Sequence, residues 1–224
     1  MNARSLLPAV AGIAMATALA AAARASDDPA SDYLVKLFRQ ACLPNIGHPE
    51  AVSSWATEQH LDAVANPEAI FMFVGRKSPG SAWLVQDSSG AFALAVRAYP
   101  PSCVTYALHA RASDVEAGFA AIVAEQTKPD RQPRLEQDQV ISSPQGKIHS
   151  IVDRFPAAAG QPEFALTVAV ADRPGGPFMG MIQAMRTVGP GPVDPLIPMP
   201  GPPRPPMPPP GAPVPGAPPL APKN

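Results

Sequence analysis

Apolar residues recur at helical spacing in three stretches of the chain. The first stretch begins at Ser31 or Asp32 as the N-cap, and its apolar face consists of Leu34, Leu37, Phe38, Ala41 and Cys42. The second begins at His48, with Pro49 in the first turn, where a missing N–H costs nothing. The third follows Ser113-Asp114-Val115-Glu116, a sequence that predicts a capping box at a helix start.

Six other stretches have the apolar pattern of buried or half-buried strands. They cover 83–85, 92–96, 103–109, 148–155, 164–170 and 179–185. Turn-forming clusters such as Asp87-Ser88-Ser89-Gly90 separate them. Two further stretches stay ambiguous: the apolar run 70–74 fits a buried strand or a helix end, and the polar stretch 130–139 fits a loop or an edge strand.

The order of these elements is helices, three strands, one helix and about three more strands. This order predicts an α+β fold, an antiparallel sheet of about six strands with helices packed on one face. Residues 26–188 would form it as a single domain. The pattern suggests an internal duplication, although no matching residues support one.

The chain begins with the features of a secretory signal peptide. Arg4 supplies positive charge, 6–22 is apolar and uncharged, and Ala23-Arg24-Ala25 fits a small-x-small cleavage site. We expect cleavage after 1–25, export to the periplasm or beyond the cell, and no transmembrane anchor afterwards. The alternative is an uncleaved anchor, which Pro8 disfavours.

Residues 189–224 differ from the rest in composition, because nearly half of them are Pro and most others are Gly, Ala or Met. Such a segment cannot form a packed core, so we predict a disordered or polyproline-II-like tail. It is either a spacer or a docking segment for an envelope protein or a cell-wall component. The stretch Pro202-Pro203-Arg204-Pro205-Pro206 resembles ligands of proline-recognising domains.

Charge and cysteine content narrow the possible functions further. The chain has 17 Lys and Arg against 18 Asp and Glu, for a net charge of −1, and signal-peptide loss would remove two arginines and no acid. This balance lacks the basic footprint of nucleic-acid binding. Cys42 and Cys103 are the two cysteines, both in the exported portion and outside any C-x-x-C motif, so we predict a structural disulfide between them.

Motifs for catalysis, metal binding or phosphate binding are missing from the sequence. We therefore assign no catalytic residues, no metal ligands and no cofactor. His109 and His149 lie on predicted strands, where they would be neighbours across the sheet and candidates for a general base. Met179 and Met181 share a predicted strand face with Met185; Met there is typical of core filling, and the alternative is a pocket for a small ligand or copper(I).

Several features together resemble a family of small exported proteobacterial proteins with one cysteine pair and no assigned activity. They are the signal peptide, the helix with Leu37-Phe38-Arg39-Gln40-Ala41-Cys42, the segment Gly80-Ser81-Ala82-Trp83, and a strand with Cys103 before the helix 113–126. The resemblance covers about residues 30–125 and implies an architecture without catalytic residues.

Three functions follow as hypotheses. The first is a periplasmic, non-enzymatic binding module stabilised by a disulfide, with the tail as a contact for its partner. The second is a carrier that holds a small ligand on the sheet face near Met179 and Met181. The third is a small envelope hydrolase whose site, with His109 or His149 as base, carries no recognisable motif.

Overall fold

The computed structural model describes residues 27–75, 78–143, 146–158 and 162–187. The predicted signal peptide, 1–25, and the predicted Pro-rich tail, 189–224, lie outside the described residues.

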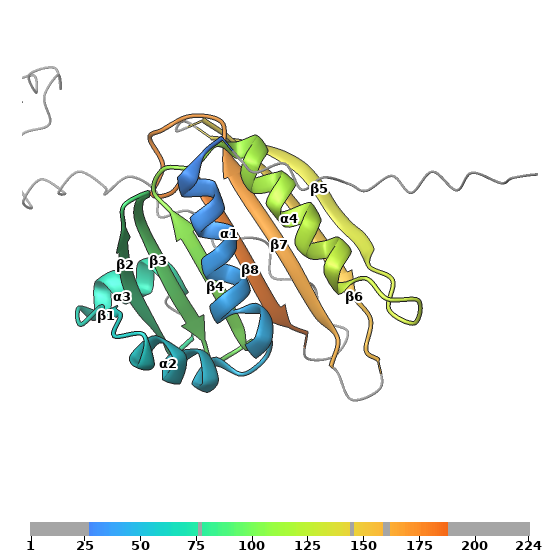
Figure 1. Ribbon diagram of the computed structural model, residues 1–224, viewed down its shortest axis with the longest axis horizontal. Helices are drawn as coiled ribbons and strands as arrows, with labels where there is room; N and C mark the ends of the chain where they lie inside the picture. The colour runs from blue at the N-terminus through green and yellow to red at the C-terminus, as the bar shows by residue number, and fades with distance from the viewer. Residues whose placement is uncertain (1–26, 76–77, 144–145, 159–161, 188–224) are drawn as a thin grey trace, which may run out of the picture.

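Over the described ranges the chain forms four α-helices, one 3₁₀ turn and eight strands (Figure 1). The helical elements are α1 (Pro29–Ala41), η1 (Leu43–Asn45), α2 (Pro49–Glu58), α3 (Pro67–Val74) and α4 (Ala112–Gln126). The strands are β1 (Asp62–Ala63), β2 (Gly80–Asp87), β3 (Gly90–Arg97), β4 (Ser102–Ala107), β5 (Arg134–Ser143), β6 (Gly146–Phe155), β7 (Phe164–Ala171) and β8 (Gly180–Arg186).

All eight strands belong to one antiparallel sheet in the order β1-β2-β3-β4-β8-β7-β6-β5. The α+β class is therefore confirmed, whereas the expected count of about six strands was too low. The two additional strands gave weak signals: β1 has two residues, too few for a periodicity, and β5 is the polar stretch that fitted a loop or an edge strand.

The sheet is built from two similar halves. In the first, α1 is followed, after the segment with α2, β1 and α3, by the meander β2-β3-β4; in the second, α4 is followed by the meander β5-β6-β7-β8. The last strands of the two meanders, β4 and β8, pair at the middle of the sheet, with Thr105 opposite Ile182. This arrangement agrees in architecture with the duplication that the element order suggests.

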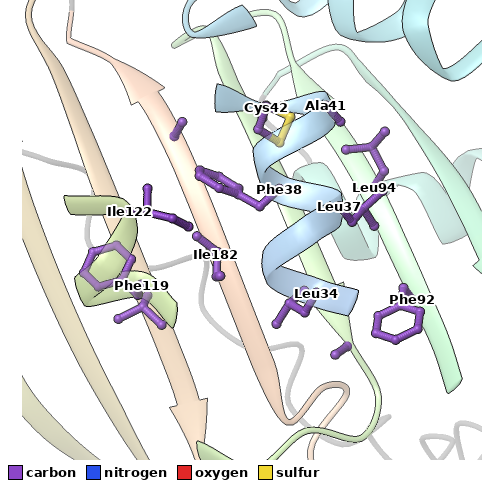
Figure 2. Close-up of a cluster of buried hydrophobic side chains, with 14 of the residues drawn as sticks. Leu34, Leu37, Phe38, Ala41, Cys42, Phe92, Leu94, Phe119, Ile122 and Ile182 are labelled. Carbon is purple, nitrogen blue, oxygen red and sulfur yellow. A yellow bond between two sulfur atoms is a disulfide. The ribbon is translucent and has the colours of Figure 1, made fainter. Parts of the chain in front are cut away.

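One face of the sheet is covered by α1, α4 and α2, and the larger core lies beneath them (Figure 1). Leu34 and Phe38 of α1 are fully buried above β4 and β8. Figure 2 shows Phe38 directed toward Ile182 of β8, with Phe119 and Ile122 of α4 alongside. The apolar face that the sequence predicts for the first helix is therefore the face that fills this core.

The expectation that helices cover a single face was incomplete, because α3 packs on the opposite face. Its Val74 is buried against small residues of β2 and β3, among them Ala82 and Ala95. Tyr106 of β4 donates a hydrogen bond from its hydroxyl to the Phe73 carbonyl (2.9 Å), and burial raises its pKa. The alanines that alternate with large residues along β3 therefore make room for a helix.

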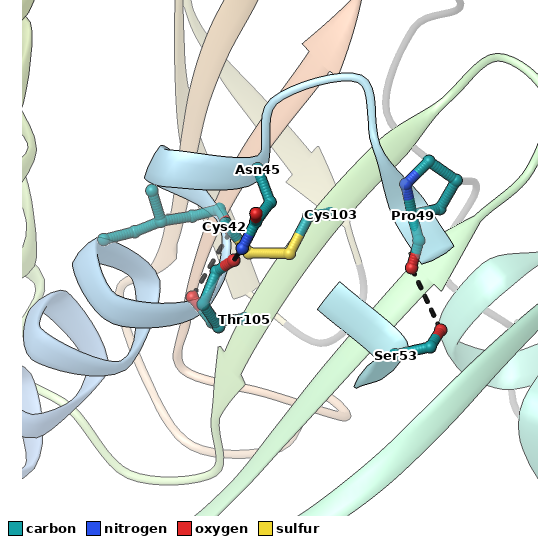
Figure 3. Close-up of a disulfide and its surroundings, with 8 residues drawn as sticks. Cys42, Asn45, Pro49, Ser53, Cys103 and Thr105 are labelled. Carbon is teal, nitrogen blue, oxygen red and sulfur yellow. Dashed lines mark hydrogen bonds between the residues drawn. A yellow bond between two sulfur atoms is a disulfide. The ribbon is translucent and has the colours of Figure 1, made fainter. Parts of the chain in front are cut away.

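Cys42 and Cys103 form the predicted disulfide (Figure 3). Cys42 ends α1 and is fully buried, and Cys103 lies on β4 with a Cα–Cα distance of 5.4 Å between them. Next to the bond, the Asn45 side-chain amide donates to the Ala41 carbonyl (2.9 Å) and closes the turn after α1. The disulfide thus fixes α1 to a central strand.

The start of α1 differs from the expectation. The helix begins at Pro29 with Asp28 as N-cap, rather than at Ser31 or Asp32. Ser31 is instead fully buried, and its hydroxyl donates to Asp28 Oδ2 (2.5 Å). The Arg111 N–H at the start of α4 donates to the same oxygen (2.7 Å), so one carboxylate joins the first turns of both helices. This contact links residues far apart in sequence, which a local pattern does not reveal.

Loss of the disulfide should lower the stability of the domain. We expect the variant Cys42→Ala/Cys103→Ala to lose about 4 kcal/mol of unfolding free energy, because a cross-link across a sequence separation of 61 residues restricts the unfolded chain. Denaturant unfolding of the oxidised, reduced and double-alanine proteins measures this. Equal midpoints for oxidised and reduced protein would contradict a structural role for the bond.

Close packing of α1 on α4 should make Gly118 intolerant of side chains. A Cβ at Gly118 would lie 2.4 Å from Cγ2 of Val35, so we expect Gly118→Val to destabilise the protein by about 1–3 kcal/mol. Ala120→Val, at an exposed position of the same helix, controls for the helix propensity of Val. The prediction fails if thermal unfolding shows the same loss for the two variants.

Candidate functional site

His149 lies where α4 crosses the second meander. It is on β6, opposite Val140 of β5 and Val170 of β7, and its side chain is on the helix-covered face. This face is the one that the alternation along β6 predicts, since Ile151 and Phe155 lie on it as well. The residue therefore sits between the edge strand and a helix.

Two carboxylates hold the imidazole of His149. Its Nδ1 lies 2.7 Å from Glu116 Oε1 of α4, and its Nε2 lies 2.8 Å from Asp138 Oδ1 of β5. Ionised carboxylates accept hydrogen bonds and donate none, so a ring that donates to both of them carries a proton on each nitrogen. The geometry therefore favours the imidazolium form of His149.

This environment shifts the titration of His149. Hydrogen bonds to Asp138 and then to Glu116 raise its pKa above the usual 6.5, and the partial burial of the ring opposes them. The side chain of His149 is 30% exposed, and those of Glu116 and Asp138 are 32% and 55% exposed. Because water reaches all three groups, the bridge is a surface contact rather than a buried ion pair.

The bridge leaves the imidazole poorly suited to general-base catalysis. A general base needs an unprotonated nitrogen within hydrogen-bond reach of a substrate proton, and both nitrogens of His149 are already within hydrogen-bond distance of a carboxylate. What the arrangement does is hold three elements together, namely α4, β5 and β6. This contact connects the edge strand β5 to the helix layer.

Glu116 and Asp138 were missed as partners of His149 in the sequence interpretation. Glu116 was assigned to a capping box, but α4 has Arg111 as N-cap without a side-chain cap bond, and Ser113 donates to Asp114 instead. Asp138 belongs to the ambiguous stretch 130–139. The signal available in the sequence was a carboxylate one residue from a buried helix position, Val115, which is too common to identify a pair.

A second cluster of charges lies at the opposite end of β6. Arg154 contacts Glu136 of β5 through Nε and Glu163 through Nη1 (2.5 Å), and Arg134 donates to Glu136 (2.9 Å). The hydrogen bond from Arg154 holds the pKa of Glu136, and that of Glu163, below the usual range. These groups are mutually neutralised and connect β5, β6 and the start of β7.

The other candidate residues do not gather around His149. His109 is exposed just after β4. Strands β8 and β7 lie between β4 and β6, so the expectation that His109 and His149 are neighbours was wrong. Met181 is buried in the smaller core on the face that carries α3. Met179 is half-buried before β8, and its N–H donates to the Ala107 carbonyl (2.8 Å).

Within residues 27–75, 78–143, 146–158 and 162–187 there is no group of three or more His, Cys, Asp or Glu side chains arranged to hold a metal ion.

None of the helices in the described part of the chain has the length and apolar character needed to cross a membrane.

Comparison of the chain with protein-family models, with curated proteins and with solved structures gave no match.

The His149 bridge should stabilise the protein in a pH-dependent way. Because folding raises the pKa of His149, its contribution is fully present below the unfolded-state value of about 6.5 and is lost as the pH rises through the folded-state pKa. We therefore expect the stability difference between the wild type and His149→Gln to shrink as the pH increases above 6.5.

Chemical denaturation from pH 6 upward measures the difference, with His109→Gln as the matched control at an exposed histidine. A difference that stays constant or grows with pH would contradict the bridge. An NMR titration of the His149 ring provides an independent reading, and its midpoint should lie above 6.5.

Proposed function

We propose that the protein is an exported, disulfide-stabilised binding module that contacts an envelope protein or a cell-wall component and catalyses no reaction. The observation that carries this proposal is the closed geometry of His149, whose two ring nitrogens are both bonded to carboxylates. The hydrolase hypothesis required that residue or His109 as base, and His109 lies in the open, away from the other candidates.

The disulfide supports the cellular location. Disulfides form and persist in oxidising compartments, and Cys42 and Cys103 are joined across the core. Together with the signal-peptide features of 1–25 and the resemblance to small exported proteins, this favours the periplasm or the cell exterior.

The partner contact is assigned to the Pro-rich segment 189–224. Strand β8 ends at Arg186, and the next residue, Thr187, donates its N–H to the Glu163 carbonyl (3.1 Å), so the described part of the chain ends beside a central strand of the sheet. A Pro-rich segment is already restricted to extended conformations and loses little entropy when a partner binds it. The folded domain would anchor this segment in the compartment of its partner.

Site-specific photo-crosslinking in the producing bacterium tests the proposal. We expect a photoreactive residue at Arg204, within the run of prolines, to yield one recurrent adduct with an envelope protein or a wall fragment. The same residue at Gln59, an exposed position at the end of α2, serves as the control. Identical adduct patterns at the two positions, or no adducts at either, would argue against binding through the tail.

The enzymatic hypothesis has its own test. The purified mature protein would be assayed on panels of ester, peptide and glycan substrates, together with His149→Gln. Turnover by the wild type would overturn the non-enzymatic proposal if His149→Gln abolished it while the variant remained folded at the assay temperature.

A further inference from the structure

Strand β5 ends the sheet and has one neighbour, β6, among the described strands. It is ten residues long, and α4 lies over β7 and β8 rather than over it. Three of the seven large apolar side chains that are exposed in the described part of the chain lie on this strand: Leu135, Val140 and Ile141, at 57%, 58% and 39% exposure. An edge strand of this length with exposed apolar residues is a site for pairing with another strand.

The hydrogen bonds of β6 indicate which main-chain groups of β5 face outward. The Lys147 carbonyl of β6 accepts a bond from the Asp172 N–H beyond β7, so the main-chain groups of Lys147 point toward β7 and away from β5. Its partner, Ser142, therefore directs its own N–H and C=O to the free edge. By alternation Val140 and Asp138 do the same.

We propose that β5 pairs antiparallel with β5 of a second copy of this chain, about a twofold axis at Val140, so that one sheet continues through both molecules. The inference goes beyond the proposed function and does not depend on it. It rests on the match between the residues of β5 and those that lie opposite them on β5 of the second copy.

In this register the opposing residues suit one another. Val140 lies against Val140 of the second copy, which covers an apolar side chain that is more than half exposed. Asp138 lies opposite Ser142, whose hydroxyl can donate to the carboxylate, and Gln139 lies opposite Ile141. Each of the outward-facing pairs exchanges main-chain hydrogen bonds, and no like charges oppose one another.

Neighbouring registers are less favourable. An axis at Asp138 sets two carboxylates against each other, and an axis at Gln139 sets Asp138 against Val140. Axes at Ile141 or Ser142 pair fewer of the outward-facing residues, because Asp138 then has no partner within β5. The register shift between Leu135 and Gln137 interrupts the regular alternation of the strand, so the pairing segment is 137–143.

A strand from this chain's own tail is a poor alternative occupant. Nearly half of residues 189–224 are Pro, and a strand added to an edge must supply main-chain N–H groups. An extended segment of a different protein is the other alternative, and the experiment separates it from a second copy.

Cysteine cross-linking of the full mature chain tests the pairing. Two Val140 residues on the axis would have Cα atoms about 5.5 Å apart, within the range for a disulfide, whereas two Ser142 residues would be about 14 Å apart. We expect Val140→Cys to form interchain disulfides at least about tenfold faster than Ser142→Cys under mild oxidation. Equal rates, or a disulfide-linked product formed only with another protein, would overturn the proposal.

Sedimentation velocity from micromolar to millimolar concentration tests association without cysteines. We expect a concentration-dependent dimer for the wild type and its loss in Val140→Lys, since lysine on the axis blocks edge pairing. Leu108→Lys, at another exposed apolar position, should keep the dimer. A wild type that stays monomeric throughout, or a dimer that Val140→Lys leaves intact, would contradict pairing through β5.

Discussion

The packing of α1 on the paired strands β4 and β8 is the contact on which the rest of the structure depends. Leu34, Phe38 and Cys42 are fully buried there, and each large apolar side chain contributes about 1.5–3 kcal/mol on burial. The surface that receives them is complete when the last strand of each meander has paired with the other. The first helix is therefore stabilised by strands from both halves. The Cys42–Cys103 bond joins the end of α1 to β4, and it adds stability by restricting the unfolded chain.

Small residues set how closely the layers approach. Gly180 on β8 lies beneath Leu34 and Val115, and a Cβ there would come within 3.1 and 3.2 Å of their side chains. Because glycine has no Cβ, α1 and α4 can both pack closely on this part of the sheet. Gly118 does the same between the two helices. Together these contacts give the helix-covered face one continuous core, while the alanines of β3 admit α3 on the opposite face.

The elements that could be predicted from the sequence are those whose burial follows a simple period. Strands 92–96 and 164–170 alternate clearly because their large residues all face one helix layer, and the disulfide followed because two cysteines allow one pairing. The run 70–74 could not be assigned because it is apolar at every position, and it proved to be the end of α3. At the candidate site the local pattern was misleading: Glu116 has the spacing of a capping box, but it contacts His149, 33 residues away, and such a tertiary partner leaves no trace in local sequence.

Asp138 belongs both to the His149 bridge and to the outward edge of β5. Through His149 it fixes β5 to β6 and α4, and it also directs its main chain toward the free edge, opposite Ser142 in the proposed pairing. A strand with one neighbour loses less entropy on pairing with a second copy when its conformation is already restricted. In the proposed pairing, the charged bridge would hold the edge strand in the geometry that a second strand needs. As the pH rises and His149 loses its proton, Asp138 loses a charged partner and that restriction weakens.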